Sequence, residues 1–316
     1  MIGKSNLPKE KMDFMKMMTS NFLSPIGVID IGSNSVRLMI SNGFLDTKDL
    51  LKKEIIITQL ASGFKNGLLN STSMLNTVNA IKKLKDFALN KGVKTIFVFA
   101  TAAVRNAENK GEFIKLVKDL CGLDIDVVSG EIEAKLGVLG AVESGNGYLI
   151  DIGGASSEVA YTENGNILYS VSHKVGAVVI KDKFDREKEI IDNYLSSFIK
   201  EDGNKNFSKE TVYAIGGTAT CLAYLDLGIK SYDPFKVHAH YMSIDRVREL
   251  KELLFTLTPQ EIVDRYQIQE KRANIISGGA SILLAILENY GFNGVVVSEK
   301  DNLEGYLKYL RGTYEE

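Results

Sequence analysis

The segment "IDIG" occurs twice in this chain, and small residues follow each copy. The first copy lies in "GVIDIGSNSVRLMI" (Gly27 to Ile40), and the second lies in "YLIDIGGASSEVA" (Tyr148 to Ala160). Each copy puts an aspartate at the end of an apolar, strand-like run and then a glycine, which permits a tight turn. A chain with two such echoes is expected to form two similar hairpins in a duplicated arrangement.

The same succession of elements follows each copy. The first half predicts strands 26–31, 35–40 and 53–60, helix 71–92, strand 94–100, helix 109–122, strand 124–129 and helix 131–144. The second half predicts strands 147–152, 157–163 and 166–173, helix 187–201, strand 211–217, helix 218–228, a helical region 244–290, strand 294–298 and helix 302–312. Alternating strands and helices in two matching halves indicate a duplicated α/β fold, with a hinge near residues 140–147.

Composition limits what such a chain does. The 316 residues are enough for two domains, and the net charge of −2 gives no general attraction to nucleic acid or to an anionic membrane. The two cysteines, Cys121 and Cys221, stand alone in apolar stretches, which is typical of reduced thiols. No apolar run reaches transmembrane length without a charge, so we expect a cytoplasmic protein with a loose or weakly helical extension at its N-terminus.

Three turns have the composition of phosphate-binding loops. Small residues after the two "IDIG" segments leave backbone N–H groups accessible, and a third turn, "AIGGTATCLA", leads from a strand into a helix whose N-terminus favours anions. Aligning the two hairpins sets Arg37 against Glu158. One hairpin can therefore offer a cation to phosphate oxygens, and the other a carboxylate to a metal or a water. Asp30 and Asp151 are of the type that binds Mg²⁺.

Six stretches together resemble the exopolyphosphatase and guanosine pentaphosphate phosphatase (Ppx/GppA) family of the actin and hexokinase superfold. They follow the family's order from Ile29 to Leu283: "IDIGSNSVRL", "FATAAVRNAEN", "SGEIEAKLG", "IDIGGASSE", "IGGTATCLA" and "KRANIISGGASIL". The resemblance implies an α/β, duplicated actin-like (ASKHA, ribonuclease H-like) fold of two lobes. It also implies Mg²⁺ as a cofactor and hydrolysis of phosphoanhydride bonds in the cleft between the lobes.

This chemistry needs a base for water and cations for the phosphoryl oxygens. Residues two apart on a helix point to nearly opposite sides, so Glu131 and Glu133 cannot both face the cleft. Glu133 shares a face with Gly137 and Gly140, where a partner can approach closely, and is our candidate for the general base. Glu131 is interpreted as an acidic residue that favours the helix dipole. Arg105 follows a buried strand and is our candidate phosphate clamp.

The candidate site residues fall into three groups. The expected catalytic residues are Glu133, Glu158 and Arg105. The expected metal ligands are Asp30, Asp151 and Glu158. The expected substrate-binding residues are Gly32, Ser33, Asn34, Ser35, Arg37, Gly153, Gly154, Ala155, Ser156, Gly216, Gly217 and Thr218.

The same resemblance sets the expected domains and partners. An N-terminal extension (residues 1–25) precedes a first lobe (26–140), which the last helix (302–316) joins, and a second lobe (141–301). The expected substrate is a small anion, either polyphosphate or guanosine pentaphosphate. No nucleic acid polymer and no membrane is expected as a partner, and a homodimer is left open.

Several positions depart from the family pattern. The second turn usually reads Asp-Ile-Gly-Gly-Gly-Ser-Thr-Glu, whereas this chain has Ala155, which is tolerable only if its φ is not positive. Val179 stands near a position where many relatives have arginine, and Asn274 replaces the aspartate of Arg-x-Asp. The family's Val-Ser-Asp-x-Gly-Leu-Arg-Glu-Gly becomes "VSEKDNLEGY". These changes bear on rate and substrate choice more than on the fold.

Four functions are therefore compared. An exopolyphosphatase that acts on short chains leads, and guanosine pentaphosphate phosphatase keeps the chemistry but changes the substrate. A sugar or acid kinase of the same superfold is weakened by Glu133 and by the motif match. A non-catalytic nucleotide or polyphosphate sensor is weakened because Asp30, Glu133, Asp151 and Glu158 are all retained.

Overall fold

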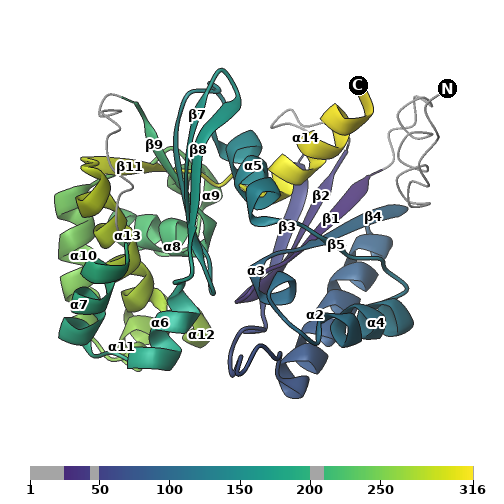
Figure 1. Cartoon of the computed structure of the whole chain (residues 1–316), viewed down its shortest axis with the longest axis horizontal. Helices are drawn as coiled ribbons and strands as arrows, with labels where there is room; N and C mark the ends of the chain where they lie inside the picture. Colours follow the sequence, from purple (N-terminus) through teal and green to yellow (C-terminus); the bar gives the residue numbers. More distant parts are fainter. Residues whose placement is uncertain (1–24, 43–49, 200–209, 316) are drawn as a thin grey trace.

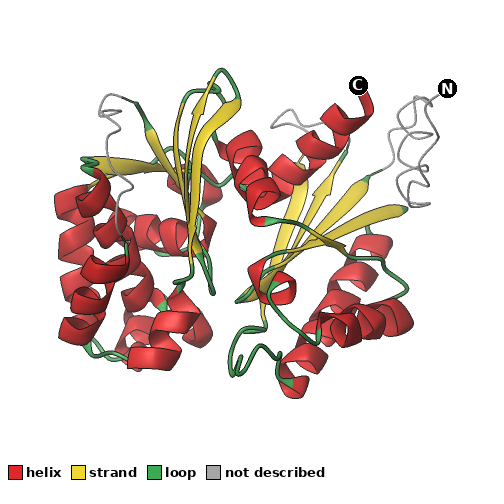
Figure 2. Cartoon of the chain, viewed as in Figure 1, coloured by secondary structure: helices red, strands yellow, loops and turns green. Residues whose placement is uncertain are grey.

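The computed structural model describes residues 25–42, 50–199 and 210–315. They form two α/β halves that lie side by side, each with one twisted sheet and helices around it (Figures 1 and 2). This arrangement confirms the expected duplicated α/β fold of two lobes. Of the expected N-terminal extension only Pro25 is described, and the rest of that prediction lies outside the described residues.

The first sheet has five strands in the order β3-β2-β1-β4-β5. Its strands are β1 (Ile26–Ile31), β2 (Ser35–Ser41), β3 (Leu50–Ile57), β4 (Thr95–Ala100) and β5 (Asp126–Val127). The first three strands form an antiparallel meander, and β4 and β5 then add in parallel to β1. The carboxyl ends of β1, β4 and β5 therefore lie at one edge of the sheet, where α/β proteins place their ligands.

The second sheet repeats this plan and adds one strand, in the order β10-β11-β9-β6-β7-β8. Its strands are β6 (Gly147–Ile152), β7 (Ser157–Glu163), β8 (Asn166–His173), β9 (Val212–Ile215), β10 (Tyr241–Ser243) and β11 (Gly294–Val297). Here β6, β7 and β8 form the antiparallel meander, and β9 and β11 add in parallel. The added strand β10 pairs antiparallel with β11 at the edge.

Helices cover both faces of the first sheet. They are α2 (Ser71–Asn90), α3 (Ala102–Arg105), α4 (Lys110–Cys121) and α5 (Gly130–Ala141). The sequence explains α2 well, because the Asn70 side chain accepts hydrogen bonds from the N–H groups of Thr72 and Ser73. Apolar residues at helical spacing in α2, including Val78 and Ile81, are buried against the sheet.

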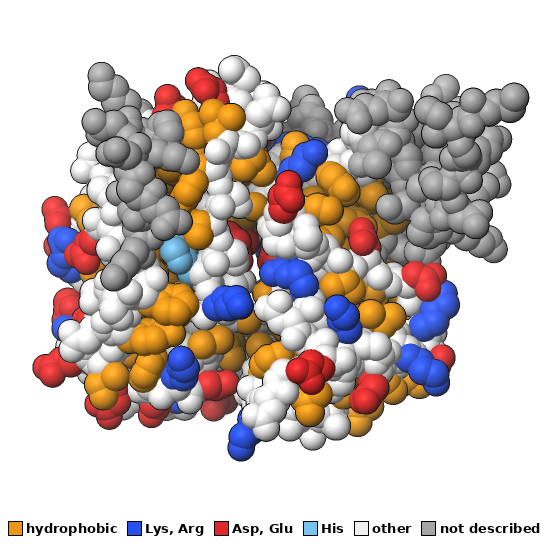
Figure 3. Space-filling model, viewed as in Figure 1, with side chains coloured by type: hydrophobic (Ala, Val, Ile, Leu, Met, Phe, Trp, Pro, Cys, Tyr) orange, Lys and Arg blue, Asp and Glu red, His pale blue; other side chains and the backbone are white. Residues whose placement is uncertain are grey.

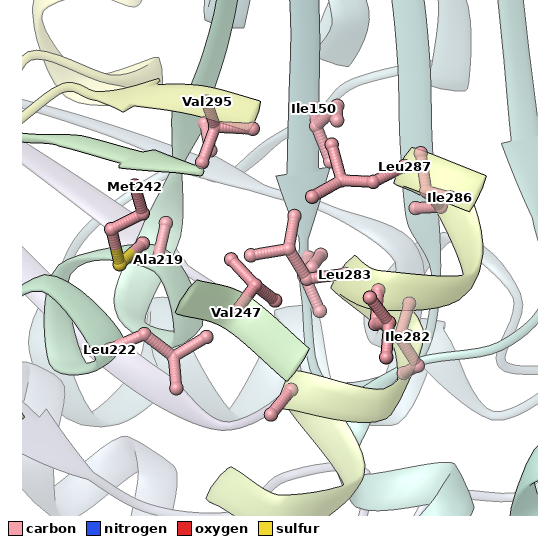
Figure 4. Packing of buried hydrophobic residues seen from close by; sticks show 14 of the residues in the cluster. Ile150, Ala219, Leu222, Met242, Val247, Ile282, Leu283, Ile286, Leu287 and Val295 are labelled. Carbon is pink, nitrogen blue, oxygen red and sulfur yellow. The ribbon is translucent and has the colours of Figure 1, made fainter. Parts of the chain in front are cut away.

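The second half has a thicker helical layer, built around the long helix α13. The helices are α6 (Ala177–Phe184), α7 (Lys188–Phe198), α8 (Gly216–Leu227), α9 (Pro234–Val237), α10 (Ile244–Thr256), α11 (Pro259–Tyr266), α12 (Glu270–Ala273) and α13 (Ile276–Tyr290). Nearly all of α13 is buried, so its apolar residues fill the space between the sheet and the outer helices. Figure 4 shows Leu287 of this helix close to Ile150 of β6, with Leu283 one turn away.

The last helix, α14 (Asn302–Glu315), crosses back to the first half and packs on β1 and against α5. The two helices touch through glycines. A Cβ atom added at Gly140 would lie 2.0 Å from the Asp301 carbonyl oxygen, and one at Gly305 would lie 1.8 Å from that of Leu136. Only glycine allows backbones to approach so closely. This α5–α14 crossing connects the two halves.

No helix among the described residues is long and apolar enough to cross a membrane. The domain boundaries, at residues 25, 140 and 301, stay a prediction, as does the cytoplasmic location.

Candidate functional site

The two "IDIG" turns have the same local geometry and touch each other. In the first, the Gly32 N–H donates to the Ser35 carbonyl oxygen at 3.0 Å, and in the second the Gly153 N–H donates to the Ser156 carbonyl oxygen at 3.0 Å. A Cβ atom added at Gly154 would lie 3.0 Å from Cβ of Ser33 in the other turn. The two hairpins therefore meet at the boundary between the two halves.

The small residues of these turns are mostly enclosed. Ser33, Asn34 and Ser156 are buried, and neither polar atom of the Asn34 side chain has a hydrogen-bond partner among the described residues. Ala155 does not have a positive φ, and it packs against the apolar core of the first half. Alanine is therefore tolerated at this position, because the backbone does not need the positive φ that glycine would allow.

The third turn lies next to the second hairpin. Gly216 has φ of +84°, and a Cβ atom there would lie 2.8 Å from Oδ1 of Asp151, so glycine is needed for both reasons. Helix α8 begins at this glycine, and its first turn includes Gly217 and the buried Thr218. The N-terminal end of an α-helix thus lies directly beside the strand-end aspartate of β6.

Glu133 and Arg105 form an ion pair at the carboxyl edge of the first sheet. Ser129 caps α5 by accepting a hydrogen bond from the Ile132 N–H, and this start buries Glu133 while it leaves Glu131 exposed. Arg105 Nη1 lies 2.6 Å from Glu133 Oε2 and also donates to the Val128 carbonyl oxygen at 3.1 Å. Burial raises the pKa of Glu133, although Arg105 opposes that shift. The helix-face prediction for the two glutamates agrees with this geometry.

Two further carboxyl groups, Asp151 and Glu158, face each other across the β6–β7 ladder. Burial, together with the charge of Glu133, raises the pKa of Asp151 to about 7. Burial, together with the charges of Glu133 and Asp151, raises the pKa of Glu158 to about 8. Ser172 Oγ donates to Glu158 Oε1 at 2.7 Å, and Asn302 Nδ2 donates to Asp151 Oδ2 at 3.2 Å. Acidic groups from both halves therefore meet in one buried region.

Arg37 is held by carboxylates in this structure. It faces Asp30 across the β1–β2 ladder, and its Nε donates to Asp30 Oδ2 at 3.0 Å. Its Nη1 pairs with Asp301, which directly precedes α14. Arg37 thus lies in the region predicted for a phosphate clamp, but with its N–H groups bound to protein oxygens.

The three predicted metal ligands do not form a cluster by themselves. Among the described residues, no three His, Cys, Asp or Glu side chains lie close enough together to hold a metal ion. One reason is that Oδ2 of Asp30 is bound to Arg37. The donor set still fits Mg²⁺, because this ion often takes one or two carboxylates and completes its shell with waters and substrate phosphates. Oδ1 of Asp30 is buried and has no hydrogen-bond partner in the part of the chain that the structure describes, which leaves it available for such a role.

Sequence reasoning missed Arg272 on α12. Its guanidinium lies over the start of α8, since a Cβ atom added at Gly217 would lie 2.3 Å from Arg272 Nη2. Burial lowers the pKa of Arg272, and no hydrogen bond or ion pair to its guanidinium group is found within the described parts of the chain. The signal was the "RAN" motif, of which only Asn274 was considered. Asp301 and Asn302 were missed as well, although they lie within the unusual segment "VSEKDNLEGY".

Basic side chains are also present at the surface near this region. On the face shown in Figure 3, Lys and Arg side chains lie on both sides of the seam between the two halves. An anionic ligand that enters from this face would meet cations before it meets the buried carboxylates.

Known proteins resemble the chain over most of its length. It is 30% identical to a bifunctional 3-dehydroquinate synthase/phosphatase of Fusobacterium nucleatum over 90% of the chain and 46% of that protein. It is 24% identical to a guanosine-5'-triphosphate,3'-diphosphate pyrophosphatase of Photobacterium profundum over 89% of the chain and 58% of that protein. The chain thus spans about half the length of these curated relatives. It is 23% identical to exopolyphosphatase 2 of Mycobacterium tuberculosis over 92% of the chain and 99% of that protein.

The fold has a solved counterpart. An exopolyphosphatase from Cytophaga hutchinsonii superposes with a TM-score of 0.81 at 24% identity, over 91% of this chain and 98% of that one. At this identity the likeness establishes the fold alone. A sequence model of the Ppx/GppA phosphatase family matches residues 40–308, which include all of the candidate residues except those of the first hairpin, from Asp30 to Arg37. The chain therefore belongs to the Ppx/GppA phosphatase family.

Proposed function

We propose that this protein is a phosphoanhydride hydrolase that releases terminal phosphate from short inorganic polyphosphate by Mg²⁺-assisted attack of water in the cleft between the halves. The observation that supports this most is the meeting of Glu133 and Arg105 from the first half with Asp151 and Glu158 from the second. A base, a cation and acidic ligands in one buried region are the groups that such a reaction needs.

Glu133 is proposed to accept the proton of the attacking water. A carboxylate with a raised pKa holds a proton more firmly at neutral pH, and this makes it a better base than an exposed glutamate. Its partner Arg105 fixes the direction of the carboxylate, because Nη1 binds both Glu133 and the carbonyl oxygen of Val128. The other N–H groups of Arg105 remain for phosphate oxygens.

The turns are proposed to bind the phosphate groups of the substrate. The N-terminus of α8 presents the backbone of Gly217 and Thr218 to an anion, and the Arg272 guanidinium lies beside it. The unpartnered Asn34 side chain lies in the turn that touches the second hairpin. The substrate would thus supply hydrogen bonds that these groups do not make with the described residues.

Asp30, Asp151 and Glu158 are proposed to hold Mg²⁺ together with the substrate. When bound, Mg²⁺ supplies neutralising charge to the phosphate oxygens. The raised pKa values of Asp151 and Glu158 are consistent with a region that lacks enough positive charge of its own. Ser172 and Asn302 orient the two carboxylates through the hydrogen bonds described above.

Guanosine pentaphosphate is the second candidate substrate. The Photobacterium relative bears the name of a pyrophosphatase for guanosine-5'-triphosphate,3'-diphosphate, which supports this choice. The Mycobacterium relative, named exopolyphosphatase 2, matches along 99% of its length, and we therefore rank polyphosphate first.

The test is phosphate release with Mg²⁺ from polyphosphates of several lengths, guanosine pentaphosphate and ATP, measured side by side. We expect turnover of short polyphosphate to exceed that of the nucleotides. Preferential turnover of guanosine pentaphosphate would favour the second candidate. Absence of hydrolysis for every substrate, with and without Mg²⁺, would remove the enzymatic proposal and favour a sensor.

A further inference from the structure

The start of α14 is bonded to the first sheet through two acidic residues. Asp301 Oδ1 accepts the Leu303 N–H at 2.9 Å, and Glu304 Oε2 accepts the Asp301 N–H at 3.0 Å. These two bonds satisfy backbone N–H groups at the start of the helix and so stabilise its first turn. Each carboxylate also uses its other oxygen. Asp301 Oδ2 pairs with Arg37 of β2, and Glu304 Oε1 lies 2.6 Å from Nζ of Lys53 of β3.

Asp301 is the less expected of the two partners of Arg37. Asp30 faces Arg37 on the neighbouring strand of the same hairpin, whereas Asp301 comes from the far end of the chain. Burial alone would raise the pKa of Asp301, but Arg37 and Lys53 outweigh burial and lower it, so this carboxyl group is ionised at neutral pH. The Arg37 side chain is 19% exposed and is therefore not fully closed off from solvent.

Carboxylate and phosphate oxygens bind the same N–H groups of an arginine. With Nε and Nη2 of Arg37 bound to Asp30, Nη1 is the group whose partner decides whether a phosphate gains access. We propose that Asp301 is a specificity-determining residue, a built-in competitor that occupies Nη1 of Arg37 until a sufficiently charged phosphate chain displaces it. This inference rests on the proposed function and on the expectation from the sequence that Arg37 binds substrate phosphate.

Asp301 keeps other partners when it releases Arg37. The capping bond to the Leu303 N–H uses Oδ1, so loss of the contact between Oδ2 and Arg37 does not uncap the helix. The Lys53 ammonium lies close enough to interact with the Asp301 charge and would remain beside it. A displaced Asp301 carboxylate thus keeps one hydrogen bond and one neighbouring cation.

Competition by Asp301 for Arg37 distinguishes ligands by the number of their phosphate groups. A single phosphate group, such as the product, gains one contact with Arg37 and must break an existing ion pair to do so. A longer chain also reaches the other cations of the region, Arg105 and Arg272, and their contacts offset the loss. Asp301 therefore favours polyphosphate over inorganic phosphate and assists release of the product.

The test is calorimetric binding of tripolyphosphate and of inorganic phosphate in the presence of EDTA, so that it does not depend on turnover. Asp301→Asn removes the charge but keeps a good N-cap residue. Loss of one charge-assisted competing bond should tighten phosphate binding roughly fivefold to tenfold, with the larger gain for inorganic phosphate. Glu304→Gln is the matched control, because glutamine keeps an oxygen for the Asp301 N–H. The change removes an equal charge one helical turn away, where the cation partner is Lys53 instead of Arg37.

A double mutant tests whether Asp301→Asn changes binding through Arg37. In an Arg37→Gln background, Asp301→Asn should leave tripolyphosphate binding unchanged. Equal tightening by Asp301→Asn and Glu304→Gln, or tightening that persists without Arg37, would show a general charge effect and overturn the inference. Binding by Asp301→Asn that equals or falls below that of the parent would also overturn it. Asp301→Ser, which likewise caps a helix, replaces Asp301→Asn if circular dichroism shows that α14 is disturbed.

These outcomes are distinct from failure of the proposed function. If the variants change tripolyphosphate binding as expected while the parent protein hydrolyses no substrate, the competitor is retained and the hydrolase proposal is lost. If the parent binds no tripolyphosphate at all, both are lost.

Discussion

Asp30 and Asp151 occupy the same place in two hairpins of the same shape, yet they face opposite charges. Across the β1–β2 ladder Asp30 is paired with Arg37, and across the β6–β7 ladder Asp151 is paired with Glu158. The first hairpin therefore contains its own countercharge. The second holds two acidic groups, and burial together with the charge of Glu133 raises the pKa of Asp151 to about 7 and that of Glu158 to about 8.

This difference shows how a duplicated backbone acquires two roles. The turn and its hydrogen bonds are alike in both copies, and the contrast depends on one residue of the second strand. A cation at that position neutralises the hairpin and provides a group that binds anions. A carboxylate there places two acidic groups close together. Their negative charge is favourable only when protons or a bound cation neutralise it.

The largest expected effect comes from replacing Glu133, the proposed general base, whose charge acts on Asp151 and Glu158 of the second hairpin. Glu133→Gln keeps the volume and an oxygen for Arg105 but loses the ability to accept a proton. The rate of phosphate release should fall roughly 10²–10⁴-fold, while substrate binding is retained or improved because a negative charge has gone. Steady-state kcat and KM, measured with polyphosphate, check this.

Glu131→Gln is the matched control for that variant, because Glu131 lies two residues away on the same helix and is exposed. It should change stability by about 0.3–1 kcal/mol through the helix dipole and leave kcat as it is. If Glu131→Gln abolished activity and Glu133→Gln did not, the assignment of the helix face would be wrong.

The second prediction compares the two aspartates directly. Asp151→Asn and Asp30→Asn should each lower Mg²⁺-dependent turnover by roughly 10²-fold or more, since each removes charge needed around the phosphate. The two variants should differ in stability. Asp30→Asn leaves the buried Arg37 with Asp301 as its remaining anionic partner and should unfold at lower urea.

Titrating Mg²⁺ against the rate, together with urea denaturation of both variants, separates these effects. An unaltered metal dependence in both would mean that the aspartates only terminate strands. Equal stability of the two variants would contradict the electrostatic contrast between the hairpins.

The third prediction concerns stability and pH. The pKa of Glu158 rises from 4.5 to about 8 in the folded protein, so between these values the folded state holds a proton that the unfolded state lacks. The stabilisation is therefore complete below about pH 4.5 and is lost as the pH rises toward 8. Between pH 5 and 8 the parent should lose on the order of 2 kcal/mol that Glu158→Gln retains.

Urea denaturation in EDTA at both pH values measures this difference. Glu163→Gln serves as the control, because Glu163 lies on the same strand but is exposed. A parent protein that grows more stable from pH 5 to 8 relative to Glu158→Gln would contradict the repulsion assigned to the second hairpin.

The smallest expected effect lies in the backbone of the second turn. Ala155 aligns with Asn34 of the first turn and has an ordinary φ, so Ala155→Gly should add freedom to the unfolded chain and remove one methyl group that packs against the core of the first half. A loss of about 0.4–1 kcal/mol in the free energy of unfolding, with unchanged kcat, is expected. A gain in stability would indicate strain at Ala155 that its φ does not reveal.

The sequence predicted the parts of this fold that depend on local pattern. The two hairpins, the capped helix α2 and the final helix follow from apolar spacing and from residues next to them in the chain, such as Asn70. The short helix α6 was not predicted. It starts where the Ala177 N–H donates to the Gly153 carbonyl oxygen, and this contact depends on the tertiary fold.

The candidate site residues also divide into those that local sequence predicts and those that only the tertiary fold reveals. Glu133 could be chosen over Glu131 because helix geometry is local, whereas the partner of Arg37 could not be found from spacing. Asp301 is 264 residues from Arg37 in sequence, and it reaches Arg37 only because α14 returns to the first sheet. Arg272 was missed for a similar reason, since its place over Gly217 depends on how α12 packs against α8.

The α5–α14 crossing has a mechanical consequence. Where two helices meet through glycine backbone, no side chain stands between them to yield or to change rotamer, so the distance between their axes is fixed at the contact. Around that point the side chains of Leu136, Leu303 and Leu307 lie in one buried cluster, so the orientation of the two helices is held as well. The crossing is therefore a rigid contact between the last helix and α5. A single methyl group added at Gly140 or Gly305 would force α5 and α14 apart. The displacement would grow with distance from this contact, so the turns proposed to bind phosphate would move most.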